Sequence, residues 1–335
     1  LKQIDEQKTT LKSQNGLEIM IAGLANTKKM VFSENGIDLK NWKSALDTSS
    51  ELSDSKTFVQ NMIDMNLSNS IFIDNTADST IPDLYEKIFS ASISVATPNK
   101  IAASSAYDQY NRLKQVAKNN NVQFLFETNV GAGLPVISTL RNLIHSGDRI
   151  IKIEAVLSGS VSFIFNNFDG KKSFSQLVTE AKDLGYTEPD PRDDLSGADV
   201  ARKITILARE AGYKVETSDV VIDPILPENC LKAKDVSTFF DILKTEDPFF
   251  SNLLTKAKNQ NGVLRFIAKA EDGRISCGVE IVSQDSPFYN LGGSDNMIVF
   301  TTQRYKQRPL VVRGPGAGAE VTAAGIFAEI ISAGN

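Results

Sequence analysis

Short apolar runs alternate with polar or amphipathic stretches in the N-terminal part of the chain. The apolar runs, which predict strands, cover 17–23, 70–74, 92–97 and 122–126. The stretches that predict helices cover 1–16, 55–66, the segment after Pro82, and 101–119. Short runs rich in Ile, Val and Phe are typical of parallel strands buried on both faces. The alternation therefore predicts an α/β fold, with helices on both sides of a parallel sheet.

The pattern changes after about residue 134. Helices are predicted near 135–146, 174–184 and 197–211, and alternating strands near 150–158, 263–270, 275–283, 296–302 and 309–313. A Gly-rich turn and a helix follow over 314–332. Clustered strands and clustered helices favour an α+β domain. We therefore expect a parallel-sheet domain over 1–134, completed by 314–335, and a second domain over 135–313.

Composition and charge exclude several classes of protein. A chain of 335 residues can bury two cores. Its net charge is −5 and its basic residues are dispersed, so nothing indicates a nucleic-acid partner. No apolar run approaches the roughly 18 residues of a membrane span, and the first residues do not resemble a signal peptide. Cys230 and Cys277 lie too far apart for a disulfide framework or a zinc site, so we expect a cytoplasmic location.

The only histidine, His145, narrows the possible chemistry. It falls in the predicted last turn of a helix before Gly147, where a cation suits the helix dipole. That structural role explains it without catalysis. Any general acid or base at neutral pH should then be Lys, Asp, Glu or Tyr.

The most informative segment covers 185–203. It contains two prolines and five carboxylates around the start of a predicted helix. Capping of the helix could explain Asp193 or Asp194. Asp199 and Lys203 are one helical turn apart, and a surface ion pair is the plain interpretation of that spacing. The alternative is that the carboxylates bind an ammonium group while Lys203 points at a reacting oxygen.

This segment resembles the signature of homoserine dehydrogenases. The likeness continues through 96–100, 128–135 and 157–160, and it is greatest to the C-terminal half of bifunctional aspartokinase–homoserine dehydrogenases, through 36–42 and 314–324. The resemblance implies a Rossmann-like nucleotide-binding domain whose first strand and Gly-rich loop lie upstream of Leu1, and a substrate-binding and dimerisation domain. The chain alone is then expected to bind NADP poorly, because that loop supplies the pyrophosphate donors.

The resemblance also implies an activity and a set of residues. The reaction would be the reversible NAD(P)H-dependent reduction of L-aspartate 4-semialdehyde to L-homoserine, in threonine, methionine and isoleucine biosynthesis. Lys203 would be the acid/base lysine, with Lys100 near substrate and cofactor. The substrate would contact Glu188, Asp199, Asp194, Tyr186, Gly159 and Ser160.

The chemistry of lysine agrees with these roles. A free lysine has a pKa near 10.4, so proton transfer at neutral pH would benefit from a lower value. A second cation such as Lys100 would lower the pKa of Lys203, and Asp199 would oppose that change. A protonated Lys203 can still polarise a carbonyl, while the nicotinamide supplies the hydride.

A structural monovalent cation is also implied by the resemblance. Sodium would bind Glu127 and the backbone carbonyls of Val130, Ala132 and Leu134, and hard cations prefer such oxygen ligands. The alternative is that this Gly-rich turn only carries the chain from one domain to the next.

Three segments are candidates for cofactor contacts. The run 314–319 satisfies G-x-G-x-x-A, but no βαβ unit follows it, so we reject a dinucleotide fingerprint there. The resemblance implies that Gly318 and Glu320 lie near the nicotinamide, although a plain helix-entry turn is the alternative. Other candidates follow predicted strands, where ligands bind in such sheets: Asn75, Thr76, Ala77, Asn26, Lys28 and Lys100. Because no acidic residue follows the strand at 17–23, NADP is favoured over NAD.

The resemblance also implies partners for the chain, and two other functions compete with it. An aspartokinase domain is expected upstream, and a homodimer or larger homo-oligomer is expected to pair through strands over 263–302 acting as sheet edges. One alternative is a dehydrogenase-like module that only regulates an attached kinase. Another is a semialdehyde enzyme that forms a thioester, which needs a nucleophilic cysteine and is disfavoured because neither cysteine has a histidine beside it.

Overall fold

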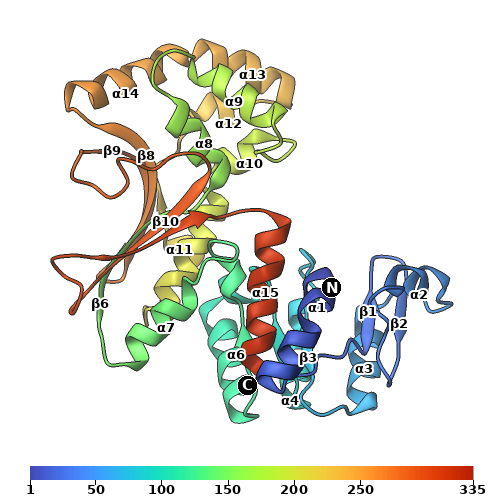
Figure 1. Cartoon of the computed structure of the whole chain (residues 1–335). Helices are drawn as coiled ribbons and strands as arrows, with labels where there is room; N and C mark the ends of the chain where they lie inside the picture. Colours follow the sequence, from blue (N-terminus) through green and yellow to red (C-terminus); the bar gives the residue numbers. More distant parts are fainter. Residues whose placement is uncertain (335) are drawn as a thin grey trace. The chain divides into compact units, whose positions relative to one another are not determined.

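The computed structural model describes residues 1–334 and divides into two compact units (Figure 1). Unit 1 comprises Leu1–Ala102, Asp108–Phe126 and the described residues from Thr322 onward. Unit 2 comprises Ala103–Tyr107 and Glu127–Val321. The predicted domain borders remain a prediction, but packing places Ala103–Tyr107 with unit 2, which the sequence did not indicate. None of the described helices combines enough length with enough hydrophobicity to span a bilayer.

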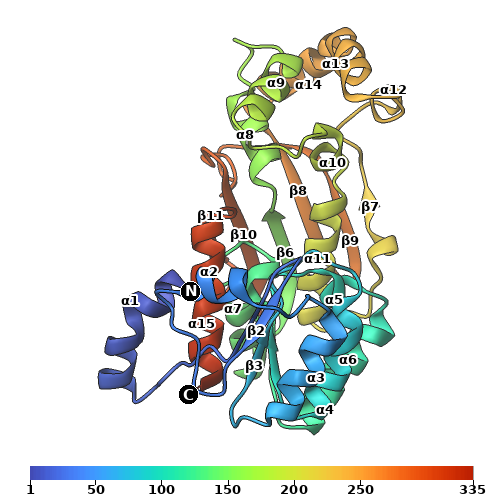
Figure 2. The ribbon, with the colours of Figure 1, turned by 90° about the vertical axis from the view of Figure 1, so that its right-hand side faces the viewer.

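A parallel sheet organises unit 1, as the alternation predicted. Its strands, in the order β3-β4-β5, are β3 (Ile71–Ile73), β4 (Ser94–Ala96) and β5 (Phe124–Leu125). Helices nearby are α3 (Ser55–Met65), η2 (Ile81–Leu84), α4 (Tyr85–Ser90) and α6 (Tyr107–Asn119), seen from the side in Figure 2. Edge-to-face contacts among Tyr85, Phe89 and Phe124 hold α4 against the sheet.

The strand predicted over 17–23 is wrong in position and partner. The strand is β1 (Gly23–Ala25), and it pairs antiparallel with β2 (Met30–Phe32) in a separate two-stranded sheet. The Asn26 side chain accepts hydrogen bonds from the backbone of Lys28 and Lys29 and so closes the hairpin turn. The hydrophobicity of residues 17–23 indicated an extended segment. It did not indicate which strand would pair with that segment.

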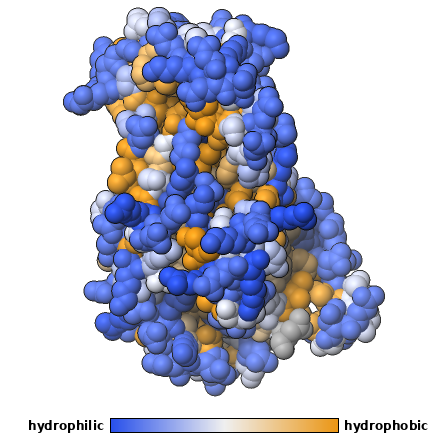
Figure 3. Space-filling model, turned by 90° about the vertical axis from the view of Figure 1, so that its left-hand side faces the viewer, coloured by the Kyte–Doolittle hydropathy of each residue, from blue (hydrophilic) through white to orange (hydrophobic). Residues whose placement is uncertain are grey.

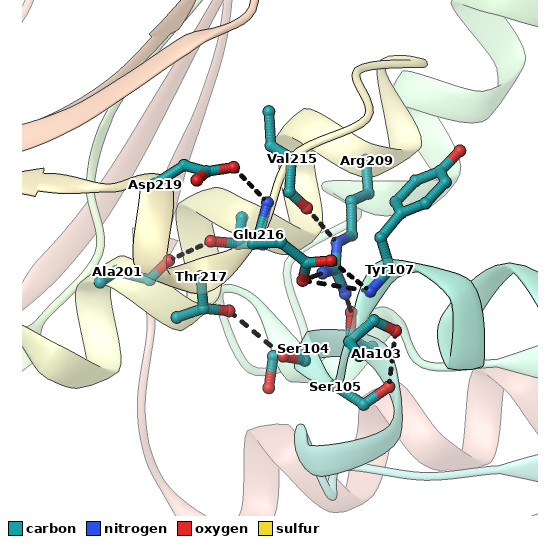
Figure 4. A network of polar contacts seen from close by, with 12 residues as sticks. Ala103, Ser104, Ser105, Tyr107, Ala201, Arg209, Val215, Glu216, Thr217 and Asp219 are labelled. Atoms are coloured by element: carbon teal, nitrogen blue, oxygen red, sulfur yellow. Dashed lines mark hydrogen bonds and ion pairs between the residues drawn. The ribbon is translucent and has the colours of Figure 1, made fainter.

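The remaining helices of unit 1 lie close to their predicted positions, except that one short helix was not predicted and one predicted helix is broken in two. Preceding the hairpin are α1 (Lys2–Thr10) and a π-helix, η1 (Leu11–Asn15), and α2 (Trp42–Thr48) follows it. The helix predicted over 101–119 is broken into α5 (Ile101–Ser104) and α6. The break is the segment that packs in unit 2, where Arg209 and Glu216 hold it (Figure 4).

A mixed six-stranded sheet organises unit 2, in the order β11-β10-β6-β8-β9-β7. The strands are β6 (Ile150–Val156), β7 (Val221–Ile222), β8 (Val263–Glu271), β9 (Arg274–Val282), β10 (Asp295–Thr302) and β11 (Leu310–Pro315). Of the strands over 263–302, β8 and β10 are not sheet edges, because each has a neighbour on both sides. Strand β9 is paired on its outer side only at Ser276 and Cys277, by the two residues of β7, so the expectation of an edge is met by β9 alone. The outermost strands are β7 and β11.

Helices of unit 2 include several that the sequence pattern did not reveal. The predicted ones are α7 (Ile137–His145), α9 (Phe174–Asp183), α11 (Ala198–Glu210) and α15 (Ala319–Gly334), the last of which continues into unit 1. The others are α8 (Gly159–Asn167), α10 (Pro191–Leu195), η4 (Thr217–Asp219), α12 (Glu228–Leu231), α13 (Val236–Thr245) and α14 (Asp247–Asn259). Helices α9, α12, α13 and α14 gather at one end of the sheet (Figure 2). His145 ends α7 as predicted.

Candidate active site

The segment before α11 is shaped by a cap and a glycine. Asp190 accepts the backbone N–H of Arg192 as the N-cap of α10, and Pro191 occupies the first helical position. Gly197 separates α10 from α11 with φ +77, and an added Cβ there would lie 3.1 Å from the ring of Phe266. Glycine is required on both counts, so the start of α11 and the direction of its first turn are fixed.

Lys203 is held inside unit 2 rather than in bulk solvent. Its Nζ lies 2.7 Å from Asp199 Oδ2 and donates to the carbonyl of Leu157 at 2.7 Å. The Lys203 side chain is only 12% exposed, against 46% for Arg202, the other cation beside Asp199. The plain interpretation as a surface ion pair therefore fails for Lys203. The described contacts use two of the three ammonium donors.

The Asp194 carboxylate connects two other candidate substrate residues, Ser160 and Glu188. Asp194 accepts the Ser160 hydroxyl at 2.8 Å through Oδ1 and the backbone N–H of Glu188 at 2.8 Å through Oδ2. The candidates Ser160, Glu188 and Asp194 thus lie close together. Ser160 comes from α8, and the other two come from the segment before α11. Asp194 has this role instead of the capping role considered from the sequence.

Tyr186 and Glu188 lie at the more exposed side of this loop. The Tyr186 ring stacks on Phe163 of α8, with centroids 4.7 Å apart, and is 45% exposed. The Glu188 side chain is exposed. Both side chains are open to solvent, so a cationic group can reach the Glu188 carboxylate or the face of an exposed ring without a change of fold.

The start of α8 contributes one group that the sequence did not single out as a site residue, Ser158. Ser158 caps the helix and lies 3.0 Å from the Ser160 hydroxyl. An added Cβ on Gly159 would lie 3.4 Å from the Ser294 carbonyl oxygen, so a larger residue would disturb this approach. A serine directly before glycine is a cap signal, but only after a helix has been predicted there.

The connection between β9 and β10 is anchored by a buried arginine. Arg265 donates from Nε to the Phe288 carbonyl at 3.0 Å and from Nη2 to the carbonyls of Tyr289 at 2.9 Å and Leu291 at 3.2 Å. Burial lowers the pKa of Arg265 to about 10. Because these carbonyls satisfy the guanidinium, the connection reaches Ser294 in a defined conformation.

A buried amide lies under the Gly-rich turn. Asn296 is fully buried, and neither polar atom of its side chain has a hydrogen-bond partner in the described structure. Its side chain occupies the space where a Cβ on Gly316 would stand. Gly318 follows with φ +127, and Glu320 lies exposed in the first turn of α15. This geometry fits a helix-entry turn and leaves the cofactor role of Gly318 and Glu320 a prediction.

The candidate cation ligands lie in a tight turn before α7. Both Glu127 carboxylate oxygens accept backbone N–H groups at the start of that helix, at 2.6–2.7 Å from Val136, Ile137 and Ser138. Ala132 adopts φ +53, and the Leu134 carbonyl accepts the Val136 N–H. Oxygen donors of this kind fit a hard cation. Glu127 also has a capping role that needs no ion. Within residues 1–334, no group of three or more His, Cys, Asp or Glu could hold a metal.

Candidate cofactor residues of unit 1 lie at the carboxyl ends of β3 and β4. Asn75, Thr76 and Ala77 are exposed directly after β3, and Lys100 follows β4. The Thr76 hydroxyl points inward and donates to Asp74 at 2.7 Å. This edge fits a nicotinamide dinucleotide, because ligands of parallel sheets bind beyond the carboxyl ends of the strands.

Asn26 and Lys28 are not at that edge. They occupy the turn of the separate β1–β2 hairpin, so the argument that placed them after a strand of the parallel sheet is wrong. Their contact with a cofactor remains a prediction.

The two cysteines are buried thiols. Burial raises the pKa of Cys230 to about 11 and that of Cys277 to about 11. Thiolates are the nucleophilic form, so neither residue suits thioester chemistry at neutral pH.

A parallel sheet of the kind that binds ligands beyond the carboxyl ends of its strands, in one unit, and a partly buried lysine paired with Asp199 on α11, in the other, are features of a two-domain α/β enzyme. Two family models match the chain: "Homoserine dehydrogenase, NAD binding domain" over residues 1–127 and "Homoserine dehydrogenase" over residues 135–331. The chain belongs to the homoserine dehydrogenase family, and its unit 1 has the Rossmann-like fold of that family.

Curated relatives agree with this assignment. A maize chloroplastic bifunctional aspartokinase/homoserine dehydrogenase 2 is 42% identical over 334 residues, covering 99% of this chain and 36% of the relative. A homoserine dehydrogenase of Schizosaccharomyces pombe is 46% identical over 269 residues, covering 78% of this chain and 72% of the relative. The chain thus spans little more than a third of the bifunctional maize relative.

Solved structures show the same fold. A Candida auris protein described as of unknown function is 38% identical with a TM-score of 0.91, covering 98% of this chain and 93% of that one. A hyperthermophilic archaeal homoserine dehydrogenase mutant in complex with NADPH is 25% identical with a TM-score of 0.72, covering 97% of this chain and 92% of that one.

Proposed function

We propose that this chain catalyses the reversible NAD(P)H-dependent reduction of L-aspartate 4-semialdehyde to L-homoserine. The observation that carries the proposal is the Lys203 ammonium, held by Asp199 and the Leu157 carbonyl with 12% of its side chain exposed. Membership of the homoserine dehydrogenase family supports it. The Asp194 cluster next to the same helix supplies the carboxylates that an amino-acid substrate requires.

The chain's own residues provide binding and proton transfer. Glu188 and Asp194 bind the substrate ammonium group, and Ser160 and Gly159 bound the pocket. The remaining Lys203 donor bonds the aldehyde oxygen and stabilises negative charge as it develops there. The nicotinamide supplies the hydride when it is bound. Lys203 then gives its proton to the alkoxide, and in the reverse direction it takes the alcohol proton.

The cofactor proposal is NADP, with NAD as a possible second cofactor. Asn75, Ala77 and Lys100 would hold it at the carboxyl edge of the parallel sheet, and Lys28 would favour a 2′-phosphate. The NAD-binding family model over residues 1–127 and the NADPH complex of the archaeal relative support a nicotinamide cofactor. We also propose a structural Na⁺ at Glu127 and the carbonyls of Val130, Ala132 and Leu134, on which no catalytic step depends.

Two partners belong to the proposal. The bifunctional relatives support a covalently linked aspartokinase in the whole protein. A homodimer is supported by apolar surface on the face drawn in Figure 3, since such patches on a monomer mark association sites.

The direct test is NADPH oxidation with aspartate semialdehyde, followed by absorbance, at NADPH concentrations that saturate the chain. Lys203→Ala should lower kcat by at least about 100-fold, as expected for loss of a general acid. Arg202→Ala is the matched control, because it removes the exposed cation beside Asp199 and should leave kcat nearly unchanged. Equal rates for Lys203→Ala and wild type would refute the acid role, and an inactive wild type would refute the proposed function.

A further inference from the structure

A buried polar network lies at the carboxyl ends of β3 and β4 in unit 1. Asp74, Tyr85, Thr97 and Asn99 are 1%, 0%, 0% and 4% exposed. Buried polar groups are costly unless they are hydrogen-bonded, so a network of this depth must be organised by its contacts. It lies between two segments that the proposed function uses, residues 75–77 and Lys100.

Asp74 is the centre of the network. Its Oδ1 accepts the backbone N–H of Thr76 at 2.9 Å and the Thr76 hydroxyl at 2.7 Å. Its Oδ2 accepts the Tyr85 hydroxyl at 2.6 Å and the Asn99 amide at 3.1 Å. All four partners in the described contacts are uncharged donors, which suits the two acceptor oxygens of this side chain. Burial and then the charge of Asp74 raise the pKa of Tyr85, so Tyr85 remains a donor.

Asn99 links this centre to both functional segments. Its Nδ2 also donates to the Asp78 carbonyl at 2.9 Å, at the end of the loop after β3. Its Oδ1 accepts the Ile101 N–H at 3.1 Å, and its own N–H donates to Thr97 Oγ1 at 2.9 Å. The residues directly before and after Lys100 are therefore both fixed by the Asn99 bonds. If the Asn99 side-chain amide were flipped, its oxygen would face the Asp74 carboxylate and its nitrogen would face the Ile101 N–H. The contacts of Asn99 therefore agree only with the orientation that points Nδ2 at Asp74.

We infer that Asp74 and Asn99 are positioning residues that hold the Lys100 backbone in register with the cofactor segment 75–77. The inference rests on the proposed function, because it assigns the purpose of the network to the reaction. The Asp74–Asn99 bond makes two loops from neighbouring strands into one rigid edge. The Asp74–Tyr85 bond, by contrast, only anchors the carboxylate to α4.

These two branches can be separated by substitution. Asp74→Asn replaces one acceptor oxygen with an amide donor, which faces either the Thr76 N–H or the Asn99 amide, so in both orientations one of the two loops loses its bond to residue 74. Asn99→Ala removes the link while Asp74 keeps three donors. Tyr85→Phe deletes the bonds of the Tyr85 hydroxyl to Asp74 and Thr97, leaves the Asp74–Asn99 bond in place and keeps the ring in the core. Asp78→Asn is the matched control, because the exposed Asp78 carboxylate accepts from Thr80 and Ile81, outside the network, and Asn99 uses the Asp78 backbone carbonyl.

The experiment compares kcat, the KM of each substrate and Tm for the full chain and the four variants. Asp74→Asn and Asn99→Ala should lower kcat by about 10- to 100-fold at a temperature where they are folded, because small misplacements of catalytic groups have effects of that size. Tyr85→Phe should lower Tm with wild-type kcat, and Asp78→Asn should keep wild-type kcat.

Two results would overturn the inference. One is wild-type kcat in Asn99→Ala, and the other is an equal loss of kcat in Tyr85→Phe and Asn99→Ala, which would show a purely structural network. If the wild type does not reduce aspartate semialdehyde, the proposed function fails instead. NADPH titration by fluorescence then decides the inference, which requires weaker binding by Asp74→Asn than by Asp78→Asn.

Discussion

A carboxylate–guanidinium pair shapes the loop that carries the candidate substrate residues. Asp190 Oδ1 lies 2.9 Å from Arg192 Nε, and the side-chain hydrogen bond from Arg192 lowers the pKa of Asp190 below its usual 3.8. A lowered folded-state pKa stabilises the protein fully above the unfolded pKa. The stabilisation is lost as pH falls through the folded-state pKa.

Asp190→Asn tests this link between charge and pH dependence. Asparagine caps a helix as well as aspartate does, so the substitution removes the charge and keeps the cap. We expect the variant to have a lower Tm near neutral pH, by a few degrees, and to approach wild type as the pH falls below about 4. Thermal denaturation followed by circular dichroism measures both curves. Curves that stay parallel from neutral to acid pH would rule out a contribution from this pair.

Sequence reasoning at this scale found residue types but not their long-range partners. The spacing of Asp199 and Lys203 predicted their ion pair, because positions four apart on a helix are neighbours. The Leu157 carbonyl beside Lys203 comes from the end of a distant strand, and no local pattern encodes it. Thr76 was proposed as a cofactor contact, yet its hydroxyl points to Asp74, because a buried carboxylate competes for nearby donors.

The break between α5 and α6 is stabilised by a buried arginine of α11. Arg209 donates to the carbonyls of Ala103 and Val215, each at 3.0 Å, and pairs with Glu216 at 3.0 Å (Figure 4). Glu216 in turn accepts the backbone N–H of Tyr107 at 3.0 Å. The backbone groups that a continuous helix would pair internally are satisfied by α11 and the residues after it.

Arg209→Met should therefore destabilise the chain by about 2–3 kcal/mol, since buried carbonyls and the Glu216 carboxylate lose their partner. Arg202→Met, on the exposed side of the same helix, is the control and should change stability by less than about 0.5 kcal/mol. Urea denaturation at equilibrium gives both values. Equal stability of the two variants would mean that the break does not depend on Arg209.

This break shows why element boundaries escaped the sequence pattern. Residues 101–119 have helical periodicity throughout, and the interruption is imposed by side chains about 100 positions away. The hairpin β1–β2 and the short α10 escaped for a different reason, because their limits depend on local bonds of the Asn26 and Asp190 side chains, which hydrophobic periodicity does not register. Long periodic elements such as α11 and β8 were predicted well, since burial of one face determines them.

At the scale of the whole molecule, the sequence predicted two architectures but not the order of strands. The mixed sheet joins β10 to β6 and β6 to β8, pairs that lie far apart along the chain. Such pairings depend on which strands meet during packing, and hydrophobic alternation alone leaves them open. A dimer formed by strand pairing would use β7, β11 or the outer side of β9, which β7 pairs at two positions only.

The longer edge, β11, is the better candidate for pairing with a second copy. It has six residues against two in β7, and Val311 on it is 42% exposed. An exposed edge strand offers unpaired backbone groups to another chain, and a lysine on it opposes that pairing. Val311→Lys should convert the dimer to a monomer in light scattering after gel filtration. Val221→Lys, at the 70% exposed position of the opposite edge, should remain a dimer. A monomer only in Val221→Lys would move the interface to β7, and a monomeric wild type would remove the dimer from the proposal.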